Sequence, residues 1–108
     1  MKLVIAIVQD KDASRLRSTF VANDIVATKL ATAGGFLRAG NTTYFVAIDD
    51  EKVDLVLQLI KETCSARKQY MTPPVSINGD GAEQTFPIEV EVGGATVMVL
   101  PIDAFHQF

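Results

Sequence analysis

The chain has 108 residues, of which 48% are hydrophobic and 21% are charged. A single domain of this size can bury a sizeable core without disulfides, and this composition excludes disordered and collagen-like proteins. The net charge of −3 argues against binding of a nucleic-acid polymer, because proteins that bind one carry a strongly basic surface. We therefore expect one domain over residues 1–108.

Basic side chains are concentrated near the start of the chain. Residues 1–40 carry six basic and three acidic side chains, whereas the remaining residues carry four basic and ten acidic ones. An anionic ligand is therefore expected to meet the first forty residues. The single cysteine, Cys64, and the single histidine, His106, are too few for a zinc site, so we predict no metal and no cofactor.

The apolar run at residues 3–8 is too short for a signal peptide or a membrane span. This predicts a cytoplasmic protein without membrane insertion. The run is β-branched and continuous, which is typical of a central strand. Helical spacing of apolar residues follows at 13–20, with Asp10 or Asp12 as a candidate cap. The next two strands are predicted at residues 25–33 and 42–48, separated by a mobile loop at about 34–41.

The second half repeats this pattern. Apolar residues from Val53 to Cys64 recur at i, i+3, i+4, i+7 and i+11, which predicts an amphipathic helix with Asp49 or Asp50 as its cap. Residues 66–86 are polar and rich in turn-forming residues, so a second mobile loop is expected there. The last predicted elements are a strand at 88–92, a turn at Gly93-Gly94 and a strand at 95–100 that pairs back as a hairpin.

This order predicts an α+β, ferredoxin-like βαββαβ sandwich with an extra C-terminal hairpin strand. Two helices cover only one face of such a sheet. The apolar run at residues 3–8 indicates that the other face is dry as well. We therefore expect subunits to bury that face in an oligomer. The alternative is that the 66–86 loop and the C-terminal tail cover it.

The segment GGFLRAGN, residues 34–41, is the strongest candidate for ligand binding. It lacks the lysine of a P-loop and precedes a strand rather than a helix. Its glycines let backbone N–H groups approach an anion, Phe36 offers a face for a base, and Asn41 matches the adenine edge. Arg38 and Lys29 add positive charge. The same residues also fit a tight connection with Phe36 packed as a plug.

No set of catalytic residues stands out in the sequence. Cys64 lies on the apolar face of its predicted helix, which favours a buried hydrophobe over a nucleophile. His106 lacks an identifiable acid or nucleophile as a partner, and the serines sit in no nucleophile elbow. The residues therefore offer no catalytic set.

Four stretches that reach both ends of the chain carry a resemblance to a known family. They are MKLVIAIVQDKDA, ATKLATAGGFLRAGNTT, VEVGGATV and VLPIDAFHQF. The chain resembles the PII-like cyclic di-AMP receptors, which are small bacterial signalling proteins. The resemblance implies a homotrimer of ferredoxin-like subunits with cyclic di-AMP bound between neighbours, and it implies no enzymatic activity. It also implies loops that change order on binding and present a surface to a downstream protein, which the sequence does not identify.

The resemblance also implies which residues bind the ligand. The positions that match the family's binding pattern are Thr28, Gly35, Phe36, Leu37, Asn41 and Gln107. Two further binding positions depart from that pattern, because Ala47 replaces a glycine and Met98 replaces an aromatic residue. Val26 stands where some members carry arginine, and it joins Ala27 and Gly93 as an additional candidate.

Two other functions stay open at this stage. One is a PII-type regulator that binds ATP or another mononucleotide, but such proteins use a long loop where this chain has only residues 34–41. The other is a small acylphosphatase-like hydrolase, in which Arg38 and Asn41 would hold the phosphate. Titration with nucleotides separates the first, and phosphate release from an acyl phosphate separates the second.

Overall fold

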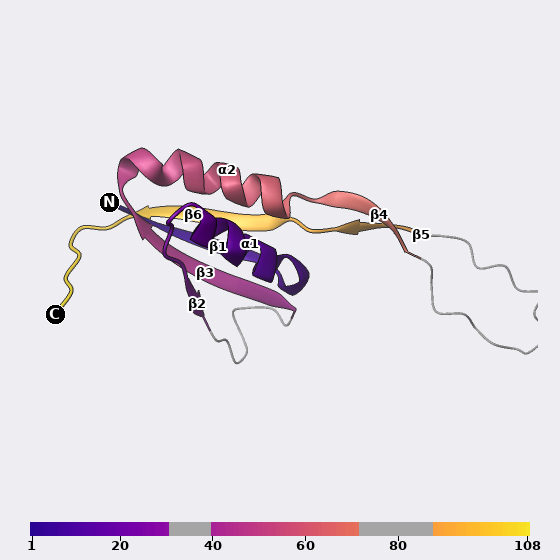
Figure 1. Cartoon of the computed structure of the whole chain (residues 1–108), viewed down its shortest axis with the longest axis horizontal. Coiled ribbons are helices and arrows are strands. Elements are labelled where there is room, and N and C mark those ends of the chain that lie inside the picture. The colour runs from indigo at the N-terminus through magenta and orange to yellow at the C-terminus, as the bar shows by residue number, and fades with distance from the viewer. Residues whose placement is uncertain (31–39, 72–87) are drawn as a thin grey trace, which may run out of the picture.

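Two antiparallel sheets and two α-helices make up the residues that the computed structural model describes, which are 1–30, 40–71 and 88–108 (Figure 1). The elements in chain order are β1 (Lys2–Gln9), α1 (Asp10–Ala22), β2 (Thr28–Leu30), β3 (Asn41–Ile48), the short 3-10 helix η1 (Asp50–Lys52), α2 (Val53–Cys64), β4 (Arg67–Met71), β5 (Ile88–Val92) and β6 (Ala95–Pro101).

The larger sheet has the strand order β2-β3-β1-β6, and its strands are antiparallel to their neighbours. Both helices lie on one face of this sheet (Figure 1). β1 occupies an inner position, which agrees with its continuous apolar sequence. This arrangement of four strands and two helices is the ferredoxin-like fold that the sequence predicts.

The hydrophobic core lies between the sheet and the two helices. Because side chains alternate along a strand, every second residue of β1 is buried beneath the helices, whereas its other residues are half-buried. The ring of Phe20 on α1 meets Tyr44 on β3 edge to face, with 6.1 Å between ring centroids. The core side chains from strands and helices include Val4, Ala6, Val8, Leu16, Val46, Val56, Ile60 and Cys64.

The opposite face of the sheet is also largely apolar. Leu3, Ile5 and Ile7 of β1 point away from the helices and are half-buried. Phe45 lies beside Ile5 on β3, and Met98 lies beside it on β6. This open face is therefore apolar, as the run at residues 3–8 indicates.

The predicted hairpin of residues 88–92 with residues 95–100 is wrong. β5 pairs with β4, and β6 pairs with β1 along its whole length. Gly93 and Gly94 both have positive φ, but they pass the chain from one sheet to the other instead of reversing it. The backbone N–H of Gly94 donates to the carbonyl of Cys64, which fixes this crossing at the end of α2.

The predicted loop over residues 66–86 is wrong at its start, because residues 67–71 form β4. This strand was missed because Arg67, Lys68 and Gln69 are polar. Residues 72–86 and 34–39 lie outside the described residues. So do residues 31–33 of the predicted strand 25–33, of which β2 covers Thr28–Leu30.

The acidic residues predicted as caps of α1 have other partners. The helix begins at Asp10, so Asp10 and Asp12 lie within its first turn, where negative charge is favourable. The hydroxyl of Thr42 donates to Asp10 at 2.6 Å. Asp12 is an ion-pair partner of two arginines.

Before α2, η1 occupies the position of the predicted cap. Asp49 precedes η1 without a capping hydrogen bond among the described residues, and Asp50 binds the amino group of Met1 at 2.8 Å. The amphipathic helix itself is confirmed at Val53–Cys64.

Candidate functional site

Asn41 lines a cavity between α1 and the strands β2 and β3. The cavity has a volume of about 570 Å³. Its lining includes two cationic side chains, Arg17 and Lys29, and one carboxylate, Asp10. Ser14, Thr42 and Tyr44 add hydroxyl groups and Ala13 and Leu30 add apolar surface. The cavity thus has an excess of positive charge, and Asn41 borders it at the start of β3.

The helix contributes a polar stripe to this cavity. Asp10, Ser14 and Arg17 are spaced by four and three residues, so they lie on one face of α1. Arg17 is exposed and forms no ion pair within the described parts of the chain. Its guanidinium is therefore available to an anion that enters the cavity.

The base of the cavity is held by hydrogen bonds around Asn41. The backbone N–H of Asp10 donates to the carbonyl of Gly40 at 2.9 Å, and the Thr42 hydroxyl donates to the Asp10 carboxylate. Asn41 itself pairs with Gln9 in the β1–β3 ladder. These contacts fix the backbone on both sides of Asn41.

Tyr44 gives the cavity a rigid wall. Its hydroxyl donates to the carbonyl of Ala13 at 3.0 Å, and its side chain is buried. Burial raises the pKa of Tyr44 above its ordinary value. The phenol therefore stays neutral at physiological pH and adds no negative charge beside a bound anion.

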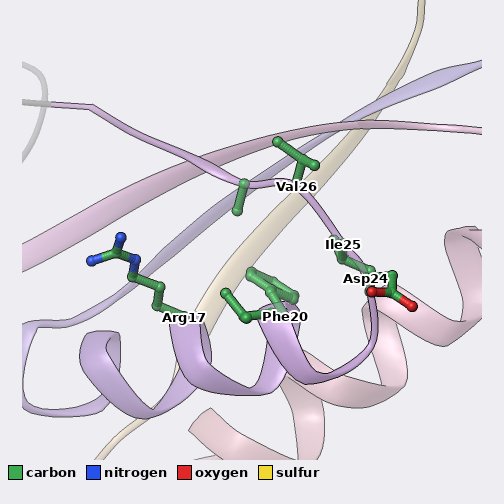
Figure 2. A pocket seen from close by; sticks show the side chains of 7 residues that line it. Arg17, Phe20, Asp24, Ile25 and Val26 are labelled. Carbon is green, nitrogen blue, oxygen red and sulfur yellow. The ribbon is translucent and has the colours of Figure 1, made fainter.

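A second cavity of about 380 Å³ lies at the end of α1, and Arg17 lines it too. Figure 2 shows Arg17 and Asp24 on either side of Phe20, with Val26 on the connection to β2. Ala27 also lines this cavity. Val26 is 83% exposed, so a longer basic side chain at this position would reach solvent. Arg17 is the basic residue that lines the cavity beside Val26.

Thr28 and Met98 lie in one row across the open face of the sheet. Thr28 pairs with Phe45, Phe45 with Ile5, and Ile5 with Met98. The two residues are on the outer strands, which places them roughly 14 Å apart at the usual strand spacing. Ala47 is exposed and lies one row further along β3.

The remaining predicted residues fall into three places. Gly93 lies at the base of β5, where its N–H donates to the side chain of Gln9 at 2.8 Å. Gln107 is exposed in the tail that follows β6. Gly35, Phe36 and Leu37, together with Arg38, lie outside the described residues.

Asn41 and Lys29 line the same cavity. The sequence analysis expects Lys29 to add positive charge near the segment that ends at Asn41. The structure also adds Arg17, which the sequence analysis missed. Asp10, Ser14 and Arg17 share one face of α1, but a polar stripe is ordinarily the solvent face of a helix, so this spacing alone does not point to a cavity.

Neither a metal centre nor a membrane helix is found in the described parts of the chain. Across residues 1–30, 40–71 and 88–108, no three His, Cys, Asp or Glu side chains are grouped to hold a metal ion. Within the same residues, neither helix is long and apolar enough to cross a membrane.

Comparisons with known proteins agree with the fold. The chain is similar to a functionally unknown protein from Pediococcus pentosaceus whose crystal structure has been solved. The two share 50% sequence identity and a TM-score of 0.80, over 99% of this chain and 96% of that one. Residues 1–108 match the family described as cyclic-di-AMP receptor. The resemblance seen in the sequence is thereby confirmed, and the chain belongs to the cyclic-di-AMP receptor family.

Proposed function

We propose that this protein is a non-enzymatic receptor that binds cyclic di-AMP between the subunits of a homotrimer. The observation that carries the proposal is the cavity that Asn41, Arg17 and Lys29 all line. A cyclic adenine dinucleotide requires an adenine-reading group and cations for its phosphates, and Asn41 borders a cavity with two cationic side chains. Membership of the family supports the same ligand.

The chemistry of the ligand divides between the two kinds of group. The Asn41 amide can donate to N7 and accept from the N6 amino group of adenine, as asparagine does when it reads adenine in DNA. Arg17 and Lys29 can neutralise the phosphates, with arginine able to form two parallel hydrogen bonds. Thr28 would supply a hydroxyl from the neighbouring strand.

The positions of the proposed binding residues support a site between subunits. Asn41 begins β3, and Ala47 lies six positions further along, roughly 20 Å away at the usual rise of a strand. The tail with Gln107 leaves the sheet beyond Ala47, at the end where Ile102 bonds to Met1. A pocket that contains both Asn41 and Gln107 therefore draws on two chains.

The open face of the sheet supports the homotrimer. It is apolar along β1, and it continues through Phe45 and Met98 onto the neighbouring strands. Sedimentation equilibrium should give the mass of three chains for the wild type. Replacing Ile5 with glutamate should release monomers, whereas replacing the exposed Gln58 of α2 with glutamate should not. A wild-type monomer would overturn the trimer.

The residue that most directly tests the proposed base contact is Asn41. Its replacement by alanine should weaken binding of cyclic di-AMP by about 1–3 kcal/mol in calorimetric titrations. Asn23 at the far end of α1 is the matched control, because its amide donates to the carbonyl of Thr19 outside both cavities. If Asn41→Ala binds as tightly as Asn23→Ala, Asn41 does not read the base.

Several finer expectations stay predictions. They are cytoplasmic location, ordering of the loops at about 34–41 and 66–86 on binding, and an unknown downstream partner. The acylphosphatase-like alternative depends on Arg38, which lies outside the described residues. An ATP-binding regulator would show itself by binding ATP in preference to cyclic di-AMP.

A further inference from the structure

The two-stranded ribbon formed by β4 and β5 extends away from the main sheet (Figure 1). Its described residues are Arg67–Met71 and Ile88–Val92, which pair in register. The ribbon joins the body where Arg67 follows α2 and where Gly93 precedes β6. The orientation of the ribbon is therefore set by contacts at these two residues.

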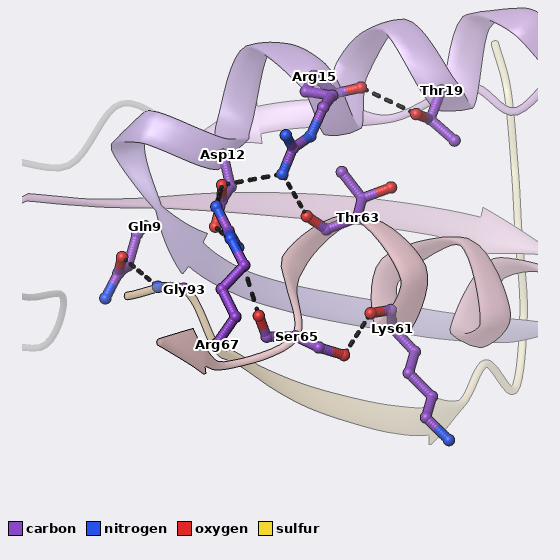
Figure 3. Close-up of polar contacts among 9 residues, drawn as sticks. All are labelled: Gln9, Asp12, Arg15, Thr19, Lys61, Thr63, Ser65, Arg67 and Gly93. Carbon is purple, nitrogen blue, oxygen red and sulfur yellow. Dashed lines mark hydrogen bonds and ion pairs between the residues drawn. The ribbon is translucent and has the colours of Figure 1, made fainter. Parts of the chain in front are cut away.

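The first contact is an ion pair with a buried carboxylate. Asp12 of α1 is 1% exposed. Arg67 donates to both of its oxygens, from Nη2 to Oδ1 at 2.9 Å and from Nη1 to Oδ2 at 3.4 Å. Arg15 donates to the same Oδ1 at 3.2 Å and to the carbonyl of Thr63 at 2.7 Å, which joins α1, α2 and the ribbon (Figure 3).

The second contact involves Gln9, the last residue of β1. Its side-chain oxygen accepts the N–H of Gly93 at 2.8 Å. Gly93 has a φ of +82°, and a Cβ built on it would lie 2.5 Å from Nη1 of Arg67. Gly93 of the second contact therefore lies directly against Arg67 of the first. We call Gln9, Asp12, Arg67 and Gly93 the ribbon junction.

The ribbon junction is bonded directly to the backbone around Asn41. Gln9 pairs with Asn41 in the β-ladder, and Asp10 binds both Gly40 and Thr42. Gln9 thus contacts both the base of the cavity and the ribbon. Asp10, which binds the base of the cavity, lies in the same helical turn as Asp12, which binds the ribbon. A displacement of residues 40–42 can therefore be transmitted to the ribbon through a few hydrogen bonds.

We infer that Gln9 and Asp12 are positioning residues that couple ligand binding in the Asn41 cavity to the stability of the ribbon junction, which anchors the β4–β5 ribbon. The inference rests on the proposed ligand site. A ligand that fixes Asn41 also fixes Gln9 and the first turn of α1, so the ribbon junction opens less often. By thermodynamic reciprocity, loosening the ribbon junction weakens ligand binding by the same factor.

Amide hydrogen exchange of residues 67–71 and 88–92 measures opening of the ribbon. A first comparison uses ligand-free protein. Thr42→Val removes the hydroxyl that binds Asp10, and Gln9→Leu removes the acceptor of Gly93. Both should speed ribbon exchange by about fivefold or more. Thr19→Val is the control, because the Thr19 hydroxyl bonds only within α1. Unchanged exchange in Thr42→Val would overturn the link between cavity and ribbon.

A second comparison adds saturating cyclic di-AMP, with binding verified by calorimetry. The ligand should slow ribbon exchange in the wild type by about fivefold or more, and this slowing should be lost in Gln9→Leu. A ligand that binds but leaves wild-type ribbon exchange unchanged would overturn the coupling. Absence of binding heat would refute the proposed function, while the ligand-free comparison would still decide whether cavity and ribbon are linked.

Discussion

Asp12 and Arg67 are 55 positions apart in sequence, yet two nitrogens of the arginine contact both oxygens of the buried carboxylate. This ion pair joins the first turn of α1 to the base of β4. A charge buried in this way is strongly destabilising once its partner is removed. Here Arg15 remains as a second partner, which moderates that effect.

Arg67→Ala is predicted to lower the free energy of unfolding, because the buried Asp12 carboxylate loses its bidentate partner. The loss is smaller than for a fully buried pair because the Arg67 side chain is 38% exposed and solvent screens its charge. Urea denaturation measures this change. Lys68→Ala on the same strand is the control, since its pair with Glu89 is exposed and should contribute less than about 1 kcal/mol. Equal losses in the two variants would contradict the prediction.

Asp12 should also make stability depend on pH. The hydrogen bond from Arg67 holds the pKa of Asp12 below its ordinary value of 3.8, with the charges of Arg67 and Arg15 adding to this effect and burial opposing it. The folded pKa is thus lower than the unfolded one. The resulting stabilisation is present above the unfolded pKa and is lost as pH falls through 3.8 towards the folded pKa.

Denaturation midpoints measured as the pH is lowered from about 6 to about 2 should therefore fall less steeply in Asp12→Asn than in the wild type. Some slope will remain, because the amino group of Met1 lowers the pKa of Asp50 in the same direction. Asp54→Asn, at an exposed position of α2, should keep the wild-type slope. An unchanged slope in Asp12→Asn would show that the ion pair does not control acid stability.

Gly93→Ala is predicted to destabilise the fold by more than about 2 kcal/mol. A positive φ alone costs a non-glycine residue roughly 1–2 kcal/mol. A Cβ at this position would also lie 2.7 Å from the carbonyl oxygen of Ser65 and 2.5 Å from Arg67. Gly40→Ala isolates the backbone cost, since its φ is +88° and nothing lies within 4 Å of the added Cβ. In thermal denaturation, the melting temperature of Gly93→Ala should be clearly lower than that of Gly40→Ala.

The Cys64 thiol is predicted to be unreactive in the folded protein. Its side chain is fully buried, and burial, with a smaller contribution from the charge of Asp12, raises its pKa to about 11. At pH 8 a disulfide reagent should therefore modify one thiol per chain only after denaturant is added. Rapid modification of the native protein would show that the core around Cys64 opens readily.

Removing Arg17 or Lys29 should weaken binding of cyclic di-AMP and reduce its dependence on salt. Each alanine variant is expected to raise Kd about threefold to tenfold, a modest change because exposed charges are screened. Lys11→Ala is the control, since Lys11 is exposed on α1 and does not line the cavity. Equal effects of all three variants would show that only the net charge matters.

Periodicity in the sequence predicts the elements that are made of apolar residues. The apolar run of β1 and the spacing of Val56, Ile60 and Cys64 in α2 place the core correctly. Pairing between strands is not contained in such patterns. The residues of β4 are polar, so the sequence left β5 with only the strand after Gly93 as its expected partner.

The candidate site is predictable only in part, for a similar reason. Asn41 and Lys29 flank a recognisable glycine-rich segment, so their proximity could be inferred. Arg17 reaches the same cavity from α1 through tertiary packing, which a local pattern does not encode. Likewise, Asp10 and Asp12 have the composition of caps, but the structure engages them with Thr42 and Arg67.

The most direct test of the receptor function is a calorimetric titration of the wild-type protein with cyclic di-AMP, alongside cyclic di-GMP and ATP. The account predicts one ligand per chain and a Kd of about 1 μM or lower, which corresponds to about −8 kcal/mol. It also predicts that cyclic di-AMP binds more tightly than the other two nucleotides. Absence of heat with cyclic di-AMP, or tighter binding of ATP, would contradict it.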